Sequence, residues 1–176
     1  FLVAPEFLFR EEGAEPDQMM ALKTAAAALD DAGGLDDVPH ERIGVVLGRG
    51  GYLTPALARL DQRVRTTNQL LDTLRSLLPE VDDDRLVAVK EAFAGQLGDF
   101  RPESAIGLVP NLAASRIANR FDFGGAAYTV DAACASSLAA LDMGCKELSG
   151  GTSDLVLCGG ADLHNGIHDY RSEERR

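Results

Sequence analysis

Cysteine is scarce in this sequence, with three residues among 176. An odd number of cysteines without paired spacing forms neither a disulfide framework nor a zinc-binding cluster. Free thiols are typical of reducing compartments, so we expect a cytoplasmic protein without disulfide bonds or a structural metal. The opening residues 1–5 have no basic lead and no long apolar core, so they do not predict a secretory signal peptide.

Long hydrophobic runs and excess positive charge are missing too. The most apolar stretch, residues 154–161, is far shorter than the roughly 20 residues that cross a bilayer. Lys and Arg number 17 against 28 Asp and Glu, a net charge of −11, which disfavours nucleic-acid binding because phosphates bind concentrated Lys and Arg. The composition, 45% hydrophobic and 26% charged, is that of an ordinary globular protein. The chain of 176 residues is long enough to bury one hydrophobic core.

Helical and strand patterns alternate along the chain. Apolar spacing and capping residues predict helices at 16–32, 54–79, 82–97, 112–119 and 134–148. Short apolar runs between turn residues predict strands at 43–47, 127–131 and 155–158. No repeat or linker divides the chain, so we expect one layered α/β domain over residues 1–176, with a parallel or mixed sheet packed against helices.

The stretch most informative about chemistry is 129–140, where a predicted strand passes through small residues into a helix that begins at Cys134. A thiol at a helix N-terminus lies near the positive end of the helix dipole and near unpaired N–H groups, which favour the thiolate. The same N–H groups can hold the oxyanion of an attacked thioester. Cys134 is therefore a candidate nucleophile. The local pattern by itself is equally consistent with a cysteine that serves only as a small packing residue. Cys145 and Cys158 are expected to be inert core thiols.

Three ordered motifs carry a family resemblance: residues 109–124, the segment Asp131-Ala-Ala-Cys-Ala-Ser-Ser-Leu138 with its preceding strand, and residues 154–161. Together they resemble the ketosynthase (β-ketoacyl synthase) domains of large fatty acid and polyketide synthases. They are most similar to those of polyunsaturated-fatty-acid synthases and iterative polyketide synthases. Residues 15–19 and 28–33 fit the first helix of that family, so the resemblance extends from near residue 5 to about Tyr170.

The resemblance implies a thiolase-like fold, partial in this chain, and decarboxylative Claisen condensation. In that reaction Cys134 would take the growing acyl chain as a thioester, and a malonyl unit on the phosphopantetheine arm of an acyl carrier protein would lose CO2 and attack it. It implies no bound cofactor or metal, an acyl carrier protein as partner, and a homodimer. By the same resemblance Ala113 and Ala114 line the acyl-binding pocket, although close helix packing explains their small size equally well.

The chain departs from that family mainly in its extent. Two His residues and a Lys used in condensation, and the strand before the first helix, have no matching motif here. Ala126 replaces a common Pro, and the charged residues 171–176 stand where the family continues with apolar sequence. We therefore expect the amino-proximal portion of a ketosynthase domain, truncated at both ends, that is acylated on Cys134 but does not condense.

Other functions stay open. A thiolase-type enzyme of the same fold would pair Cys134 with different partners, and a chain-length-factor-like or structural partner would perform no chemistry, although such proteins commonly lack the nucleophile. Residues 48–51 follow a strand as a dinucleotide-binding loop would, but the spaced third glycine is missing, so a plain turn is favoured over a nicotinamide site.

The remaining polar motifs favour structural interpretations. His164 and His168 are four residues apart, but Asn-Gly between them breaks a helix and no third metal ligand is evident, so we interpret them as loop residues. Residues 82–84, all Asp, are interpreted as a solvated helix cap rather than a metal cage. Asp131, beside the nucleophile in sequence, is assigned a structural role.

Overall fold

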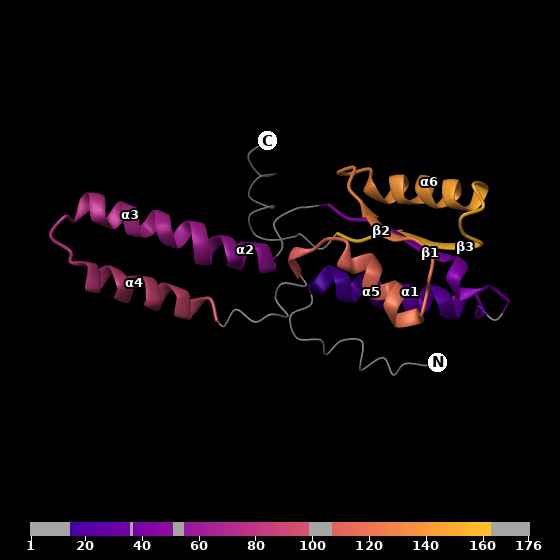
Figure 1. Ribbon diagram of the computed structural model, residues 1–176, viewed down its shortest axis with the longest axis horizontal. Coiled ribbons are helices and arrows are strands. Elements are labelled where there is room, and N and C mark those ends of the chain that lie inside the picture. Colours follow the sequence, from indigo (N-terminus) through magenta and orange to yellow (C-terminus); the bar gives the residue numbers. More distant parts are fainter. Residues whose placement is uncertain (1–14, 36, 51–54, 99–106, 163–176) are drawn as a thin grey trace.

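A small parallel sheet lies between two layers of helices (Figure 1). The computed structural model describes residues 15–35, 37–50, 55–98 and 107–162. The described strands are β1 (Ile43–Gly48), β2 (Ala127–Val130) and β3 (Leu155–Gly160), in the order β2-β1-β3. Both strand pairs are parallel, so no antiparallel member of a mixed sheet lies within these residues.

Helices cover both faces of the sheet. Helix α6 (Ser136–Ser149) packs on one face, mainly against β1 and β3. Helices α1 (Pro16–Asp31) and α5 (Leu112–Phe121) lie on the other face and contact each other (Figure 1). Because β1 is central and covered on both sides, all six of its residues are buried, as its unbroken apolar run predicts.

The register places the carboxyl ends of the three strands at one edge of the sheet. Gly48, the last residue of β1, is paired with Val130 of β2 and with Gly160 of β3. The loops that follow the strands therefore meet at this edge. In open parallel sheets this is the edge where ligands bind.

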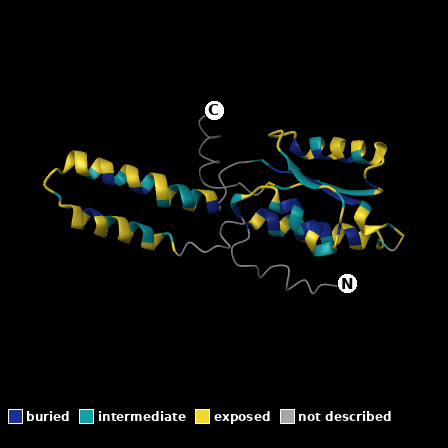
Figure 2. Cartoon of the chain, in the orientation of Figure 1, coloured by how far each residue is buried: buried dark blue, intermediate teal, exposed yellow. Residues whose placement is uncertain are grey.

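A helical hairpin projects away from the sheet (Figure 1). The helix predicted at 54–79 is α2 (Pro55–Asp61) and α3 (Thr67–Leu77), joined through one π-helical turn at Gln62–Thr66, and it is followed by α4 (Asp83–Gln96). Asp82 caps α4, since its Oδ1 accepts a hydrogen bond of 2.8 Å from the Arg85 N–H, which confirms the capping role predicted for this acidic run. Most of the hairpin surface is exposed (Figure 2).

The hydrophobic core lies between the sheet and the α1/α5 layer (Figure 2). Small alanine side chains allow α5 to pack closely against both β1 and α1, and Ile117 of α5 is fully buried in this layer. The remaining short helix, the 3₁₀ turn His40–Arg42, leads directly into β1. The buried members of the core are Leu22, Ala25, Leu29, Ile43, Val45, Leu47, Ala113, Ala114, Ile117, Ala118 and Phe123.

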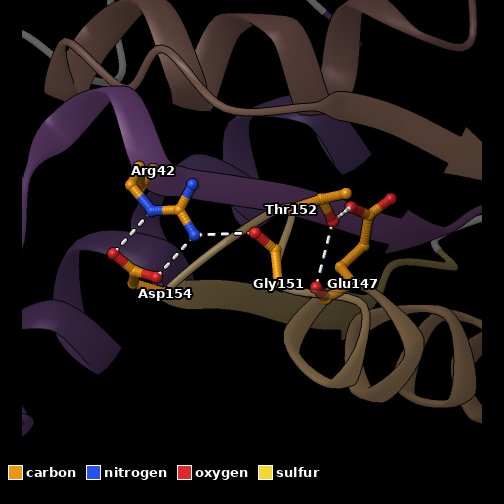
Figure 3. A network of polar contacts seen from close by, with 5 residues as sticks. All are labelled: Arg42, Glu147, Gly151, Thr152 and Asp154. Carbon is orange, nitrogen blue, oxygen red and sulfur yellow. Dashed lines mark hydrogen bonds and ion pairs between the residues drawn. The ribbon is translucent and has the colours of Figure 1, made fainter.

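A polar network ties together the starts of β1 and β3 (Figure 3). Arg42 donates two hydrogen bonds to the Asp154 carboxylate, at 2.6 and 2.7 Å, and a third of 2.8 Å to the Gly151 carbonyl. Thr152 Oγ1 donates to the Glu147 carbonyl at 3.0 Å, which joins the end of α6 to the same corner. A bidentate Arg–carboxylate pair is directional, so the network favours the observed register of β1 on β3.

This network makes stability depend on pH. The hydrogen bonds from Arg42 hold the pKa of Asp154 below its ordinary value. A group whose pKa is lower in the folded state stabilises the fold above its unfolded pKa, and this contribution is lost as pH falls through the folded pKa. We expect Asp154→Asn to lower the urea midpoint at neutral pH, and the difference from the unsubstituted chain to shrink in strong acid.

Urea denaturation between about pH 7 and about pH 3 measures this difference. The control is Asp142→Asn on α6, whose partner Lys146 lies one helical turn away on the same helix. Because exposed helical pairs contribute little, the control should change the midpoint only slightly. An Asp154→Asn difference that stays constant across the whole pH range would contradict the assignment.

Candidate active site

Cys134 lies in the loop between β2 and α6, at the carboxyl edge of the sheet, and is exposed. The predicted helix start at Cys134 is wrong by two residues, since α6 begins at Ser136 with Ala135 as its N-cap. The reason is the tight turns ahead of the helix, in which the N–H groups of Ala135 and Ser136 donate to the carbonyls three residues back, at Ala132 and Ala133, rather than four residues back as in an α-helix. Within these turns Ala133 has a left-handed φ of +48°. Cys134 therefore precedes the first turn of α6 rather than forming part of it.

Side chains on both sides hold the loop in this uncommon conformation. Asp131 Oδ1 accepts a hydrogen bond of 3.0 Å from the Ala133 N–H. Ser136 Oγ accepts from the Ala132 N–H at 2.9 Å and donates to the Ala133 carbonyl at 2.7 Å. A non-glycine residue at positive φ costs free energy and persists only where its surroundings hold it, so strain of this kind is a feature of functional loops. The structural role expected of Asp131 is visible in its hydrogen bond.

Glycines on β1 and on α6 allow this helix to lie close to the sheet. A Cβ at Gly48 would lie 2.4 Å from the Ser136 carbonyl carbon and 2.5 Å from the Ser137 nitrogen. A Cβ at Gly144 would lie 2.2 Å from Cys158 Sγ. The start of α6 can reach its position beside the strand ends only if residue 48 has no side chain. The sequence interpretation of residues 48–51 as a plain turn missed this role, although a strand-terminal glycine opposite a small-residue helix start is a signal for it.

A cavity of about 330 Å³ opens in front of Cys134. Volumes of this order are at the lower end of the range for small-molecule sites. Among the described residues its walls come from the strand ends, the loops that follow them and the start of α6, all at the carboxyl edge of the sheet, and small residues dominate. The residues that line it are Gly48, Gly50, Ala133, Cys134, Ser136, Ser137, Gly160, Ala161 and Asp162. The arrangement suits attack by an accessible thiol on a slender, extended electrophile.

The three cysteines occupy different environments. Cys158 is half-buried, and burial, with a smaller contribution from nearby Cys145, raises the pKa of its thiol. Cys145 is exposed, so its assignment as a core thiol is wrong. The buried residues of α6 are Ser136, Ala140 and Gly144, and the position after Gly144 turns outward from that face. Cys145 therefore provides an exposed reference thiol on the same helix.

The other predicted site residues lie elsewhere. Ala113 and Ala114 are 1% and 0% exposed in the core, and neither lines the cavity at Cys134. Close packing accounts for their size, and an acyl-binding role stays a prediction. His164 and His168 lie outside the described residues. Within the described ranges no group of three His, Cys, Asp or Glu side chains could hold a metal ion, and no helix is long and apolar enough to cross a membrane.

Comparisons with known proteins place the chain in a family. The model of the β-ketoacyl synthase N-terminal domain matches residues 84–175, more than half of the chain. The chain is 32% identical over 168 residues to one subunit of the polyunsaturated fatty acid synthase of Thraustochytrium sp., covering 93% of this chain and 6% of that protein. It is 29% identical over 157 residues to desertorin synthase of Aspergillus desertorum, covering 88% of this chain and 7% of that protein.

A solved structure shares the fold. The ishigamide ketosynthase/chain length factor aligns with 99% of this chain and 42% of its own, with a TM-score of 0.63 and 18% sequence identity. This likeness confirms the predicted thiolase-like fold, of which the chain holds a part. The chain spans only a small fraction of the curated relatives that it matches. The resemblance inferred from the three motifs is confirmed, and the chain belongs to the β-ketoacyl synthase family through its N-terminal domain.

Proposed function

We propose that this chain supplies the acyl-accepting site of a ketosynthase. The Cys134 thiolate attacks the carbonyl carbon of an acyl thioester carried on the phosphopantetheine arm of an acyl carrier protein. A new S–C bond forms, the bond to the carrier sulfur breaks, and the released carrier thiolate takes up a proton. The observation that carries this proposal is the exposed Cys134 in a small-residue cavity immediately before α6. Backbone N–H groups at a helix start are suited to stabilise the oxyanion.

The condensation step is proposed to need more than this chain. The chain aligns with 42% of the ketosynthase structure, and its sequence has no motif that matches the family's two His residues and Lys. We therefore propose that it represents the amino-proximal portion of a ketosynthase domain, which pairs with an acyl carrier protein and works within a dimer. All three cysteines are free, which supports a cytoplasmic location.

Acylation of the purified chain tests the proposal. With octanoyl-pantetheine as donor, we expect one octanoyl group per chain by intact mass, located on the peptide that contains Cys134 and released by hydroxylamine. Cys134→Ala should abolish this mass increase. Cys145→Ala should leave it unchanged, because that exposed thiol lies outside the cavity. Acylation that is absent, or equal at Cys134 and Cys145, would contradict the proposal.

A non-catalytic role is the second candidate. The solved structure that shares this fold is described as a ketosynthase/chain length factor, so its description includes a chain length factor as well as a ketosynthase. A folded chain that binds an acyl carrier protein but never takes up the octanoyl group would favour this candidate. The exposed Cys134 in its cavity favours the acyl-accepting site instead.

A further inference from the structure

A buried ion pair lies behind the cavity wall. Arg49 follows β1 directly, and its Nε donates a hydrogen bond to Oδ2 of Asp17 in the first turn of α1. The side chains of Arg49 and Asp17 are 1% and 4% exposed. Taking two charges out of water costs free energy that their attraction does not always offset. Such a pair is therefore weak evidence for added stability. We ask instead which parts of the backbone the pair holds in place.

The main chain around Arg49 forms part of the Cys134 site. Its N–H donates to the Val130 carbonyl at 3.0 Å, where β2 ends and the Cys134 loop begins. The preceding carbonyl, of Gly48, accepts from the Ala161 N–H at 3.0 Å. Gly48 and Gly50, the neighbours of Arg49 on both sides, line the cavity. The Arg49 side chain thus connects a wall of the cavity to α1. The rest of α1 packs on the face of the sheet opposite to α6.

A second buried carboxylate completes this cluster. Glu15 Oε1 accepts a hydrogen bond of 2.9 Å from the Ala56 N–H at the start of α2. Burial raises the pKa of Glu15, the charge of Asp17 adds to this, and Arg59 and Arg49 act against it. Glu15 Oε2 and Arg49 Nη2 have no hydrogen-bond partner among the described residues. Asp17 is the side chain that binds the Arg49 guanidinium, so its removal would release Arg49.

We propose that Asp17 and Arg49 are positioning residues for the Cys134 site, which hold the wall at Gly48–Gly50 in place and so limit the width of the group that reaches the sulfur. This inference rests on the proposed role of Cys134 as acyl acceptor. Neither side chain lines the cavity, so both act through the backbone that they hold.

Two alkylating agents of different width test the inference on the whole chain. Iodoacetamide and an N-naphthyl iodoacetamide share one reactive group, so the ratio of their rates at Cys134 reports the space around the sulfur rather than its nucleophilicity. In Asp17→Asn we expect the rate of the wide reagent to rise on the order of tenfold relative to the narrow one, because relief of a steric clash of the size found at overpacked sites changes a rate by that order. The ratio at Cys145 on the same chain should not change.

Further variants separate positioning from a general loss of stability. Arg42→Gln breaks the ion pair at the opposite end of β1 and should leave the Cys134 ratio unchanged. Asp17→Glu and Arg49→Lys keep both charges, should fold even if Asp17→Asn does not, and should give intermediate ratios. Unchanged ratios in all folded Asp17 and Arg49 variants, or an equal change in Arg42→Gln, would overturn the inference. If the chain shows the expected rate ratios but no octanoylation, the proposed function is refuted, whereas the positioning role of Asp17 and Arg49 at the cavity wall is supported.

Discussion

Replacing Gly48 with alanine is expected to abolish the selective acylation of Cys134 and to lower the free energy of unfolding by about 1–3 kcal/mol, the range for overpacked sites. The new Cβ would lie 2.4 Å from backbone atoms of Ser136, which cannot move aside as a side chain could. Helix α6 must therefore shift away from β1. That shift would displace the loop that carries Cys134, whose conformation depends on hydrogen bonds to Ser136.

The matched control is Gly95→Ala. Gly95 lies in α4, and beyond its own helix backbone no atom of the described residues lies within 4 Å of the position that its Cβ would take. Alanine is the better helix former by up to about 1 kcal/mol, so this variant should be as stable as the unsubstituted chain or slightly more so. Urea denaturation and octanoylation of both variants provide the measurements. Equal behaviour of the two alanine variants would show that close approach at Gly48 is not required.

Truncating Ile117 to alanine is expected to have the largest effect on stability. Its side chain is 0% exposed in the core between α5, α1 and the sheet. Removal of a buried branched side chain loses the transfer free energy and leaves a cavity, a combined cost of about 2–5 kcal/mol. Total stabilities are commonly about 5–15 kcal/mol, so this variant should unfold at a much lower urea concentration.

Leu138→Ala is the comparison for this prediction. Leu138 is a large apolar residue on α6, but it is 70% exposed in the described structure. Substitutions at exposed positions usually change stability by no more than about 0.5 kcal/mol. If the two variants unfolded at the same urea concentration, the core assigned to the α1/α5 side of the sheet would be wrong.

Local sequence patterns were sufficient for the order and type of the elements. The apolar run at β1, the Pro at the start of α1 and the Asp cap of α4 depend on neighbouring residues, so each could be predicted without the rest of the fold. Cys134 could be singled out for the same reason, because small residues between a strand and a helix are a local signature.

Apolar character alone did not reveal which face of α6 is buried. Leu138, Leu141 and Leu148 are exposed although they are apolar, and Cys145 lies exposed between them in sequence. The sheet-facing side instead presents Ala140 and Gly144, whose small size permits close packing. Periodicity identifies an apolar helix, but it does not distinguish two faces when one is made of small residues and the other of large ones.

The sequence by itself determined the order and type of the elements and the identity of the candidate nucleophile, because these depend on residues close together in the chain. The family was recognisable from three ordered motifs between residues 109 and 161. Only the tertiary structure revealed that Gly48 must lack a side chain and that Asp17 reaches Arg49 across 32 positions. It also showed that Cys134 precedes α6 rather than beginning it. These features arise from contacts between segments that the parallel register brings together, and no local pattern encodes a distance across a sheet.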